Sequence, residues 1–394
     1  MGAANMTGGL ATMHIGVIGA GHAGVEAARA AAEGGARVSL FSAEDCHPYY
    51  RPRLVALAFG QAEFEAIQMH PETWYGEHGI EIRRACAVES IDAGAKRVTA
   101  GGETFGFDGI VVACGSLPVV PPFAAGQESV LPLWSKADAV RIRAKVERGA
   151  HVIVLGGGIL GIEAALRALD AGMSVEIVEK MTWLMPAQFC ERASKVIESS
   201  LREKGIGVHL GRTVMAAEGG RGGQPVRLTL DDGQVREGKF CMLSIGARPR
   251  TTLAAGSGLA VERGVRVDAS LQTSGAGVYA AGDVIQVGGV TRCSVRESTA
   301  QGRVAGANVV AHLAGRPSTE YSPSAAPLMF KSGDFEIYSA GEPGGEGRVE
   351  VVLEGSTDRV LRLLVMKDGR QVGVQMIGTR EGLDDYVRLL AAPL

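Results

Sequence analysis

The sequence lacks any closely spaced pair of cysteines. Its six cysteines are scattered over 394 residues and form neither a C-x-x-C nor a C-x4-C motif: Cys46, Cys86, Cys114, Cys190, Cys241 and Cys293. This spacing excludes a local redox dithiol and a zinc knuckle, both of which need neighbouring cysteines. We therefore expect isolated thiols and no bound metal.

The sequence also lacks an excess of charge and a long apolar run. Lys and Arg together number 40 against 43 acidic residues, so the net charge is −3, which indicates neither a nucleic acid nor a membrane surface as partner. No apolar run approaches the ~18 residues of a membrane span. Residues 1–12 lack the basic start and apolar centre of a signal peptide, and we expect them to form a disordered leader. These absences favour a cytoplasmic protein.

Glycine, in contrast, is abundant. The chain has 56 glycines, about double the usual share of ~7%, and a hydrophobic content of 46%. This composition is typical of an α/β protein with tight turns and close cofactor contacts. The length indicates two or three domains.

The clearest motif is the stretch 14–24. An apolar strand over residues 15–18 is followed by Gly19-x-Gly21-x-x-Gly24 and an alanine-rich helical pattern from 23 to 32. Strand, glycine turn and helix in this order form the dinucleotide-binding fingerprint. The first glycine permits the tight turn, the second lets a pyrophosphate approach, and the third packs the helix against the strand. The free N–H groups of the helix N-terminus favour an anion there.

The stretch 151–163 repeats this motif as Gly156-x-Gly158-x-x-Gly161, so the chain has two fingerprints and is expected to bind two dinucleotides. A second strand, 173–179, ends in Glu179, which stands 21 residues after Gly158. At that offset an acid binds a ribose 2′-hydroxyl and repels a 2′-phosphate, which favours NAD over NADP.

The first repeat differs after its second strand, 37–41. Ser42 stands where a ribose-binding acid is usual, and the nearest acid is Glu44. The segment 46–54 then places Arg51 and Arg53 beside prolines and aromatics, where each could grip a phosphate or stack on adenine. A solvated turn is the alternative interpretation of this segment.

The remaining chain alternates strands with helices. Glycine turns follow apolar strands in 108–118, 241–249 and 277–283, and the last ends in Asp283. Helices are expected over 71–78, 135–146, 191–204 and 297–311, with a proline-rich linker over 119–132. After a break at 315–317, strands are expected over 336–340, 350–353, 361–366 and 372–377, and a helix over 381–390.

Together these motifs resemble the FAD- and NAD(P)H-dependent pyridine nucleotide–disulfide oxidoreductase superfamily. The resemblance covers nearly the whole chain and rests on both fingerprints, Ala113-Cys114-Gly115, 246–249 and 278–283. Segments 48–54, 74–75 and 156–163, with the short C-terminal segment, are most similar to NADH:rubredoxin oxidoreductases. Related ferredoxin reductases and the flavin modules of nitrite reductases are similar to a lesser degree.

The resemblance implies a glutathione reductase-like α/β fold with two Rossmann-like dinucleotide-binding domains, the FAD domain being split. It assigns 13–118 and 245–315 to the FAD-binding domain and 119–244 to the NAD-binding domain. It also implies that residues 316–394 form a small α+β C-terminal domain.

The resemblance also implies site residues for FAD and NADH. Asp283 holds the ribityl chain, Glu163 is the catalytic residue near the nicotinamide, and Gln301 lies at a helix start beside the flavin pyrimidine. Because the usual acid is replaced by Ser42, the adenosine ribose contact shifts to Glu44. The cofactor-binding positions are Gly19, Gly21, His22, Ala23, Gly24, Glu44, Arg51, Arg53, Ala113, Cys114, Gly115, Gly156, Gly158, Ile159, Leu160, Gly161, Glu179, Gly246, Gly282, Asp283 and Gln301.

The chain lacks the cysteine motifs that disulfide reductases and thioredoxin reductases of this superfamily carry, and this distinguishes it from them. Peroxidase and oxidase relatives carry a reactive cysteine about where Pro52 stands here, and Cys46 comes too early. The leading hypothesis is therefore transfer of hydride from NADH to FAD, then of single electrons to a small iron–sulfur or rubredoxin-type protein. The alternatives are an NADH oxidase or peroxidase, a reductase component of a nitrite reductase or ferredoxin-type system, and a redox-sensing flavoprotein. The protein is expected to be a monomer or homodimer.

Overall fold

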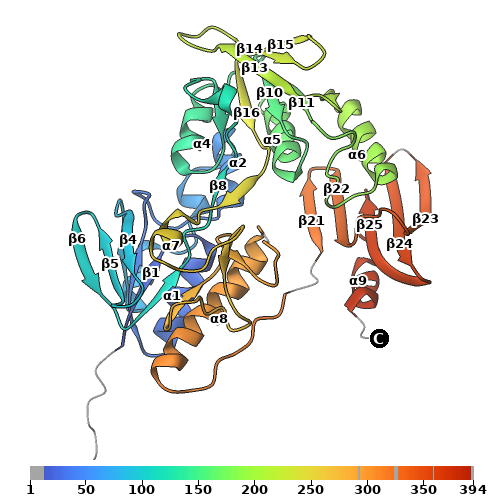
Figure 1. Cartoon of the computed structure of the whole chain (residues 1–394). Coiled ribbons are helices and arrows are strands. Elements are labelled where there is room, and N and C mark those ends of the chain that lie inside the picture. The colour runs from blue at the N-terminus through green and yellow to red at the C-terminus, as the bar shows by residue number, and fades with distance from the viewer. Residues whose placement is uncertain (1–12, 292, 324–326, 358, 392–394) are drawn as a thin grey trace, which may run out of the picture. The chain divides into compact units, whose positions relative to one another are not determined.

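The structure is a computed structural model that describes residues 13–291, 293–323, 327–357 and 359–391. The predicted leader, 1–12, lies outside these residues. Contacts divide the chain into two compact units, each built from separate segments (Figure 1). Of the described residues, the first unit comprises those of 13–51, 65–117 and 248–323, and the second comprises those of 52–64, 118–247 and 327–391.

The first unit is built on a parallel sheet of buried, β-branched strands in the order β19-β7-β1-β2-β3. Its central strand β1 pairs in register with both neighbours, so that Ile15 lies beside Val38 and Gly109. Parallel strands buried on both faces are expected to be continuously apolar. The strands are β1 (His14–Ile18), β2 (Arg37–Phe41), β3 (Ile80–Arg83), β7 (Gly109–Val112) and β19 (Val278–Ala280).

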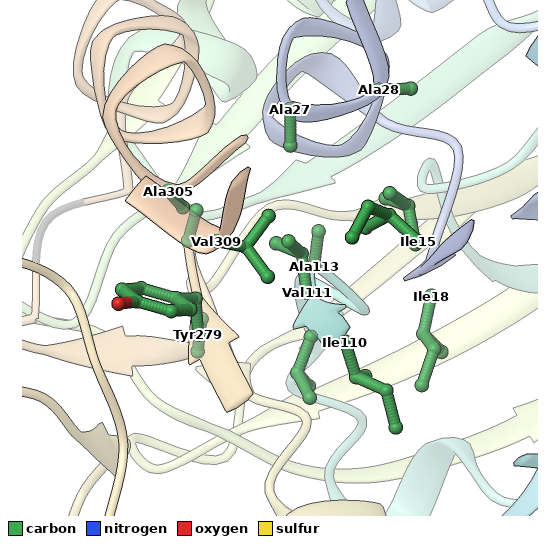
Figure 2. Close-up of a cluster of buried hydrophobic side chains, with 14 of the residues drawn as sticks. Ile15, Ile18, Ala27, Ala28, Ile110, Val111, Ala113, Tyr279, Ala305 and Val309 are labelled. Atoms are coloured by element: carbon green, nitrogen blue, oxygen red, sulfur yellow. The ribbon is translucent and has the colours of Figure 1, made fainter. Parts of the chain in front are cut away.

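Two helices, α1 (His22–Glu33) and α8 (Val295–Leu313), pack on this sheet and on each other. A Cβ atom added to Gly302 would lie 2.2 Å from the Ala23 carbonyl oxygen, and one on Gly306 would lie 2.2 Å from that of Ala27. These glycines therefore let the helix backbones touch. Figure 2 shows small side chains of both helices above the apolar side chains of the strands.

The first unit is completed by shorter elements. An antiparallel sheet in the order β4-β5-β6 adds Ile91 and Val98 to the same core. These elements are α3 (Glu72–Glu77), β4 (Val88–Asp92), β5 (Arg97–Ala100), β6 (Glu103–Gly106), α7 (Thr252–Gly256), β18 (Val265–Arg266) and β20 (Ile285–Gln286). The strands β8 (Ser116–Pro118) and β17 (Ala247–Pro249) carry the chain across the boundary between the units.

The second unit repeats the same plan. Its parallel sheet has the order β12-β11-β10-β16-β9, and α5 packs on β10 and β11. An antiparallel sheet, β13-β14-β15, shares a core with it that includes Ile153, Leu228 and Cys241. The elements are β9 (Val130–Pro132), α4 (Lys136–Arg143), β10 (His151–Leu155), α5 (Ile159–Asp170), β11 (Ser174–Val178), α6 (Glu191–Glu203), β12 (Gly207–His209), β13 (Val214–Gly219), β14 (Val226–Leu230), β15 (Val235–Gly238) and β16 (Phe240–Leu243).

A C-terminal antiparallel sheet belongs to the second unit and has the order β21-β22-β25-β24-β23. The fully buried amide of Gln375 ties it to the start of α6, because its Oε1 accepts from the Cys190 N–H at 3.0 Å. Its Nε2 donates to the Pro343 carbonyl at 2.7 Å. The elements are β21 (Leu328–Ser332), β22 (Phe335–Gly341), β23 (Val349–Thr357), β24 (Val360–Lys367), β25 (Arg370–Ile377) and α9 (Leu383–Ala391).

The contact-defined units differ from the predicted domain boundaries. Residues 118 and 245–247 lie in the second unit, and the C-terminal segment from 327 onward belongs to that unit instead of forming a third. Residues 52–64, with α2 (Leu54–Ala58), pack in the second unit against α4 and α5, where Arg143 pairs with Glu63 at 2.7 Å. Residues 316–323 stay with the first unit, because the Asn308 side chain bonds Thr319. Which cofactor each domain binds stays a prediction. The sequence pattern does not predict α2, α7, β18, β20 or β21. The predicted linker 119–132 is in part wrong, because its last residues form β9, which pairs with β16 in the parallel sheet.

Within the described ranges, no helix combines the length and apolar character that a membrane crossing requires.

Candidate functional site

The first glycine turn has the geometry that its sequence predicts. Gly19 has φ +106°, which favours glycine, and a Cβ on Gly24 would lie 1.7 Å from the Gly19 carbonyl oxygen. A Cβ on Gly19 itself would lie 2.3 Å from the Ala113 carbonyl oxygen. At Gly21, in contrast, nothing lies within 4 Å of the added atom. The turn is therefore tight on the protein side and open where a cofactor would approach.

The second glycine turn has nearly the same backbone geometry as the first. Gly156 has φ +110°, and a Cβ on Gly161 would lie 2.0 Å from the Gly156 carbonyl oxygen. Nothing lies within 4 Å of a Cβ added to Gly158. The next two residues, Ile159 and Leu160, are half-buried in the first turn of α5.

Asp283 lies just after β19 and is surrounded by hydroxyl groups. Ser116 donates to its Oδ2 at 2.8 Å, and Ser298 donates to its Oδ1 at 3.2 Å. The preceding Gly282 has φ +85° and places its added Cβ 2.8 Å from that of Ala23, so the turn packs directly on α1. Serines from two distant segments thus orient a carboxylate near the N-terminus of α1.

The Gln301 side chain forms hydrogen bonds that stabilise the turn at Gly282. Its Oε1 accepts from the Gly282 N–H at 2.9 Å, and its Nε2 donates to the Tyr321 hydroxyl at 3.2 Å. The Tyr321 hydroxyl in turn donates to Glu297, and all three side chains are buried. The expectation that Gln301 lies at a helix start is wrong, since α8 begins at Val295 and Gln301 is in its second turn. Its observed contacts support the turn, and a contact with a flavin stays a prediction.

The predicted cofactor residues Glu44 and Arg51 form an ion pair of 3.0 Å. The Tyr49 hydroxyl also donates to Glu44, at 2.8 Å, and the Arg51 guanidinium lies over the Tyr49 ring at 5.2 Å. Burial opposes the charge of Arg51, but the carboxylates of Glu44, which also accepts its hydrogen bond, and of Asp283 help to raise the pKa of Arg51 above its usual value. Ser42 accepts from the Glu44 N–H and so fixes the loop. Arg53 is exposed and belongs to the second unit.

Cys114 donates from Sγ to the Arg250 carbonyl at 3.3 Å. Burial raises the pKa of its thiol to about 11, so it stays protonated at neutral pH. Gly115, with φ +69°, accepts from the Arg250 N–H at 2.9 Å. Gly246, with φ +98°, makes the corresponding turn after β16 and accepts from the Val119 N–H.

Glu179 follows β11 and reaches back to the second glycine turn. Its carboxylate accepts from the Gly157 N–H at 2.6 Å and from the Met181 N–H at 2.7 Å. Two backbone donors fix one carboxylate beside the open face of Gly158, and each oxygen retains a lone pair for a further donor. This geometry is compatible with the predicted ribose contact.

Glu163 is half-buried on α5, and no described residue forms a hydrogen bond or ion pair with its carboxylate. Burial raises the pKa of Glu163, and the charge of Arg167 only partly opposes that effect. Arg167 instead donates to the Gln61 side chain at 2.9 Å. Perturbed carboxylates of this kind are often functional. Among the described residues no three His, Cys, Asp or Glu side chains gather to hold a metal ion.

The pyridine nucleotide–disulphide oxidoreductase family model matches residues 13–306. The chain belongs to this family. It is 31% identical to a rubredoxin–NAD(+) reductase of Alcanivorax borkumensis over 346 residues, which cover 86% of this chain and 88% of that protein. It is 26% identical to a nitrite reductase [NAD(P)H] of Bacillus subtilis over 368 residues, covering 92% of this chain but only 45% of that protein.

Among solved structures, the fold is similar to that of putidaredoxin reductase in its covalent complex with putidaredoxin. The TM-score is 0.87 at 22% identity, over 97% of this chain and 93% of that one. The predicted α/β fold with Rossmann-type domains is therefore confirmed. The family's use of FAD and NAD(H) confirms the predicted cofactors and an oxidoreductase activity.

Proposed function

We propose that this oxidoreductase passes electrons from NADH through FAD to a small iron protein of the rubredoxin type. The proposal depends mainly on one observation. The glycine turns that would bind dinucleotides have no pair of neighbouring cysteines that could accept electrons from a flavin. When bound, FAD supplies the change from two-electron to one-electron transfer, and the protein supplies binding and orientation. Similarity to rubredoxin–NAD(+) reductase supports rubredoxin as the acceptor class.

The residues of the first unit fit FAD. The open face of Gly21 leaves room for a pyrophosphate, and the half-buried Arg51 brings positive charge close enough to act on Asp283. A buried nitrogen of His22, in the same turn, has no hydrogen-bond partner among the described residues. We assign Asp283 to the ribityl hydroxyls, because a carboxylate accepts hydroxyl hydrogen bonds strongly.

The residues of the second unit fit NADH. Glu179 would accept from the adenosine ribose beside Gly158, and its charge would repel a 2′-phosphate. Glu163 would face the nicotinamide, where its raised pKa suits a group that can hold a proton. The FAD- and NAD-binding domains thus correspond in this proposal to the two repeats of the fold.

The cysteines support direct transfer from flavin to acceptor. All six lie within the described residues, and none forms a disulfide. The Cys293 side chain is exposed, yet partial desolvation and the adjacent Asp283 carboxylate raise the pKa of its thiol to about 11. Thiols with such pKa values are protonated and poor nucleophiles at neutral pH. The location in the cytoplasm and the monomeric or dimeric state belong to the same proposal.

Anaerobic stopped-flow absorbance tests this proposal. The protein is reduced with one equivalent of NADH and mixed with oxidised rubredoxin, oxygen or hydrogen peroxide in separate experiments. We expect flavin reoxidation to be fastest with rubredoxin and to match rubredoxin reduction electron for electron. Fast reoxidation by oxygen or peroxide with none by rubredoxin would instead identify an oxidase or peroxidase.

A further inference from the structure

A hydrogen-bond network connects the turn before Asp283 to the segment that follows α8. The Gly282 N–H donates to Oε1 of Gln301 at 2.9 Å, and Nε2 of Gln301 donates to the Tyr321 hydroxyl at 3.2 Å. The Tyr321 hydroxyl donates to a carboxylate oxygen of Glu297, in the first turn of α8. The three side chains of this network are between 2% and 7% exposed, so water does not readily replace a lost partner.

The carboxylate at the end of the network sets the direction of every bond in it. A carboxylate accepts hydrogen bonds and donates none, so the Tyr321 hydroxyl gives its proton to Glu297 and accepts from Gln301. The Gln301 amide therefore turns its Nε2 towards Tyr321 and its Oε1 towards the Gly282 N–H. An amide rotated by half a turn would point its own N–H groups at that N–H and could not bond it.

The backbone held by this amide leads directly to the Asp283 carboxylate. Gly282 has φ +85°, and a Cβ added to it would lie 2.8 Å from that of Ala23. One residue later, Asp283 accepts from the Ser298 hydroxyl at 3.2 Å. Ser298 and Gln301 are three residues apart on α8, so the same face of one helix holds both the carboxylate and the backbone N–H before it.

Tyr321 is itself held by bonds that do not involve its hydroxyl. Its N–H donates to the Ala269 carbonyl at 2.8 Å. Two residues earlier, Thr319 exchanges two hydrogen bonds of 2.8 Å with the Asn308 side chain, which is 1% exposed. The segment thus places the hydroxyl at a fixed position on α8, as a preorganised support for a binding group requires.

We propose that Tyr321 and Glu297 are positioning residues of the flavin site, because they fix the orientation of the Gln301 amide. This amide holds Gly282, and Gly282 sets where Asp283 presents its carboxylate to the ribityl chain. The inference rests on the proposed function, in which Asp283 binds FAD. Two residues stand between Tyr321 and Asp283 in the network, so the effect of Tyr321 on FAD is exerted through the carboxylate.

A double-mutant cycle on the FAD-loaded protein tests this role. The rate of FAD release after dilution is followed by the increase in flavin fluorescence. Asp283→Ala should release FAD about 10- to 100-fold faster than the wild type, and Tyr321→Phe, which keeps the ring, about tenfold faster. Because Tyr321 acts through Asp283, the double variant should release FAD within about twofold of the rate of Asp283→Ala alone. A residue that merely stabilised the fold would accelerate release equally in both backgrounds.

Two further variants separate the hydrogen bond from general packing. Glu297→Gln keeps an oxygen that can accept from the Tyr321 hydroxyl and should stay within about threefold of the wild-type rate, whereas Glu297→Leu should match Tyr321→Phe. If Tyr321→Phe does not fold, Glu297→Leu takes its place in the cycle. Tyr338→Phe is the matched control, because it removes a tyrosine bond of 2.9 Å to Glu336 in the second unit. It should leave FAD release unchanged.

The outcomes distinguish this inference from the proposed function. A wild type that binds no FAD, or an Asp283→Ala variant that releases FAD at the wild-type rate, would contradict the proposed function. If Asp283→Ala accelerates release but Tyr321→Phe does not, or does so equally in both backgrounds, the positioning role alone is overturned.

Discussion

Glu26 and Glu163 occupy the same place in the two repeats, two residues after the third glycine, yet their carboxylates meet opposite surroundings. Burial by itself would raise the pKa of Glu26, but hydrogen bonds from Arg303 at 2.8 Å and Arg29 at 2.7 Å lower it. No cation among the described residues forms a hydrogen bond with Glu163, and burial raises its pKa although the charge of Arg167 opposes this effect. One carboxylate is thus part of the packing between α1 and α8. The other has no hydrogen-bond partner among the described residues, so burial disfavours its charged form in the folded protein.

The glycines that give both turns their shape should be the least replaceable. Gly24→Ala and Gly161→Ala each push a methyl group to 2 Å or less from a carbonyl oxygen. Since backbone cannot move aside easily, each should cost about 1–3 kcal/mol or more of unfolding free energy. Thermal or denaturant unfolding followed by circular dichroism measures the loss. Equal stability of variants and wild type would show that α1 and α5 do not pack against their glycine turns as described.

Glu179 should decide the choice between NADH and NADPH. In Glu179→Gln the amide oxygen can still accept a backbone hydrogen bond, but the charge that repels a 2′-phosphate is gone. We expect the NADPH/NADH ratio of kcat/KM to rise at least ~10-fold, or ~1.4 kcal/mol. Glu44→Gln, in the first repeat, is the control and should leave the ratio unchanged. A wild type that uses both cofactors equally would place Glu179 away from the ribose.

Removing the charge of Glu26 and removing that of Glu163 should have opposite effects on the free energy of unfolding. Glu26→Gln breaks the contacts with Arg29 and Arg303 and should lose about 1 kcal/mol at neutral pH. This contribution of Glu26 exists above its unfolded pKa and disappears as pH falls through its lowered folded pKa. Denaturant unfolding at several pH values measures both.

Glu163→Gln should lose no stability and gain a little at neutral pH. Because the folded pKa of Glu163 is raised, its ionisation costs folding free energy that grows as pH rises from the unfolded towards the folded pKa. The same variant should slow flavin reduction by NADH. A stability loss as large as that of Glu26→Gln would mean that Glu163 has a structural partner.

The smallest effect is expected at the cysteines. Cys46→Ala and Cys114→Thr should leave acceptor turnover unchanged once folding and flavin content are checked, since threonine can also donate to the Arg250 carbonyl. Steady-state reduction of ferricyanide measures turnover. A folded, flavin-loaded Cys46→Ala with normal reduction by NADH but no acceptor turnover would place a thiol between flavin and acceptor.

The glycine turns were predictable because their causes are local. A tight turn with positive φ at Gly19 and Gly156, followed by a helix, needs glycine at fixed spacing, and the sequence shows that spacing directly. The buried strands before each turn are short and continuously apolar, which also marks them in the sequence. The position of Asp283 after a strand and a glycine was also visible in the sequence, whereas its role follows from the family resemblance and stays a prediction.

Tertiary contacts account for what the sequence could not show. The placement of 52–64 in the second unit depends on pairs such as Arg143 with Glu63. The link from Gln301 to Tyr321 joins a helix to a segment that had been expected in another domain. The difference between Glu26 and Glu163 lies in an arginine 277 residues away from Glu26 in the sequence. No local pattern carries such information.

The most direct test of the account is to block each turn separately at its open glycine. Gly21 and Gly158 have φ −83° and −79°, which alanine adopts freely, and their added methyl groups meet nothing within 4 Å. Flavin content after dialysis and NADH affinity by titration are measured for both variants at unchanged thermal stability. We predict that Gly21→Ala loses flavin, whereas Gly158→Ala keeps its flavin and loses NADH affinity. The reverse assignment, or full flavin and NADH binding in both variants, would contradict the proposal that the first turn binds FAD and the second binds NADH.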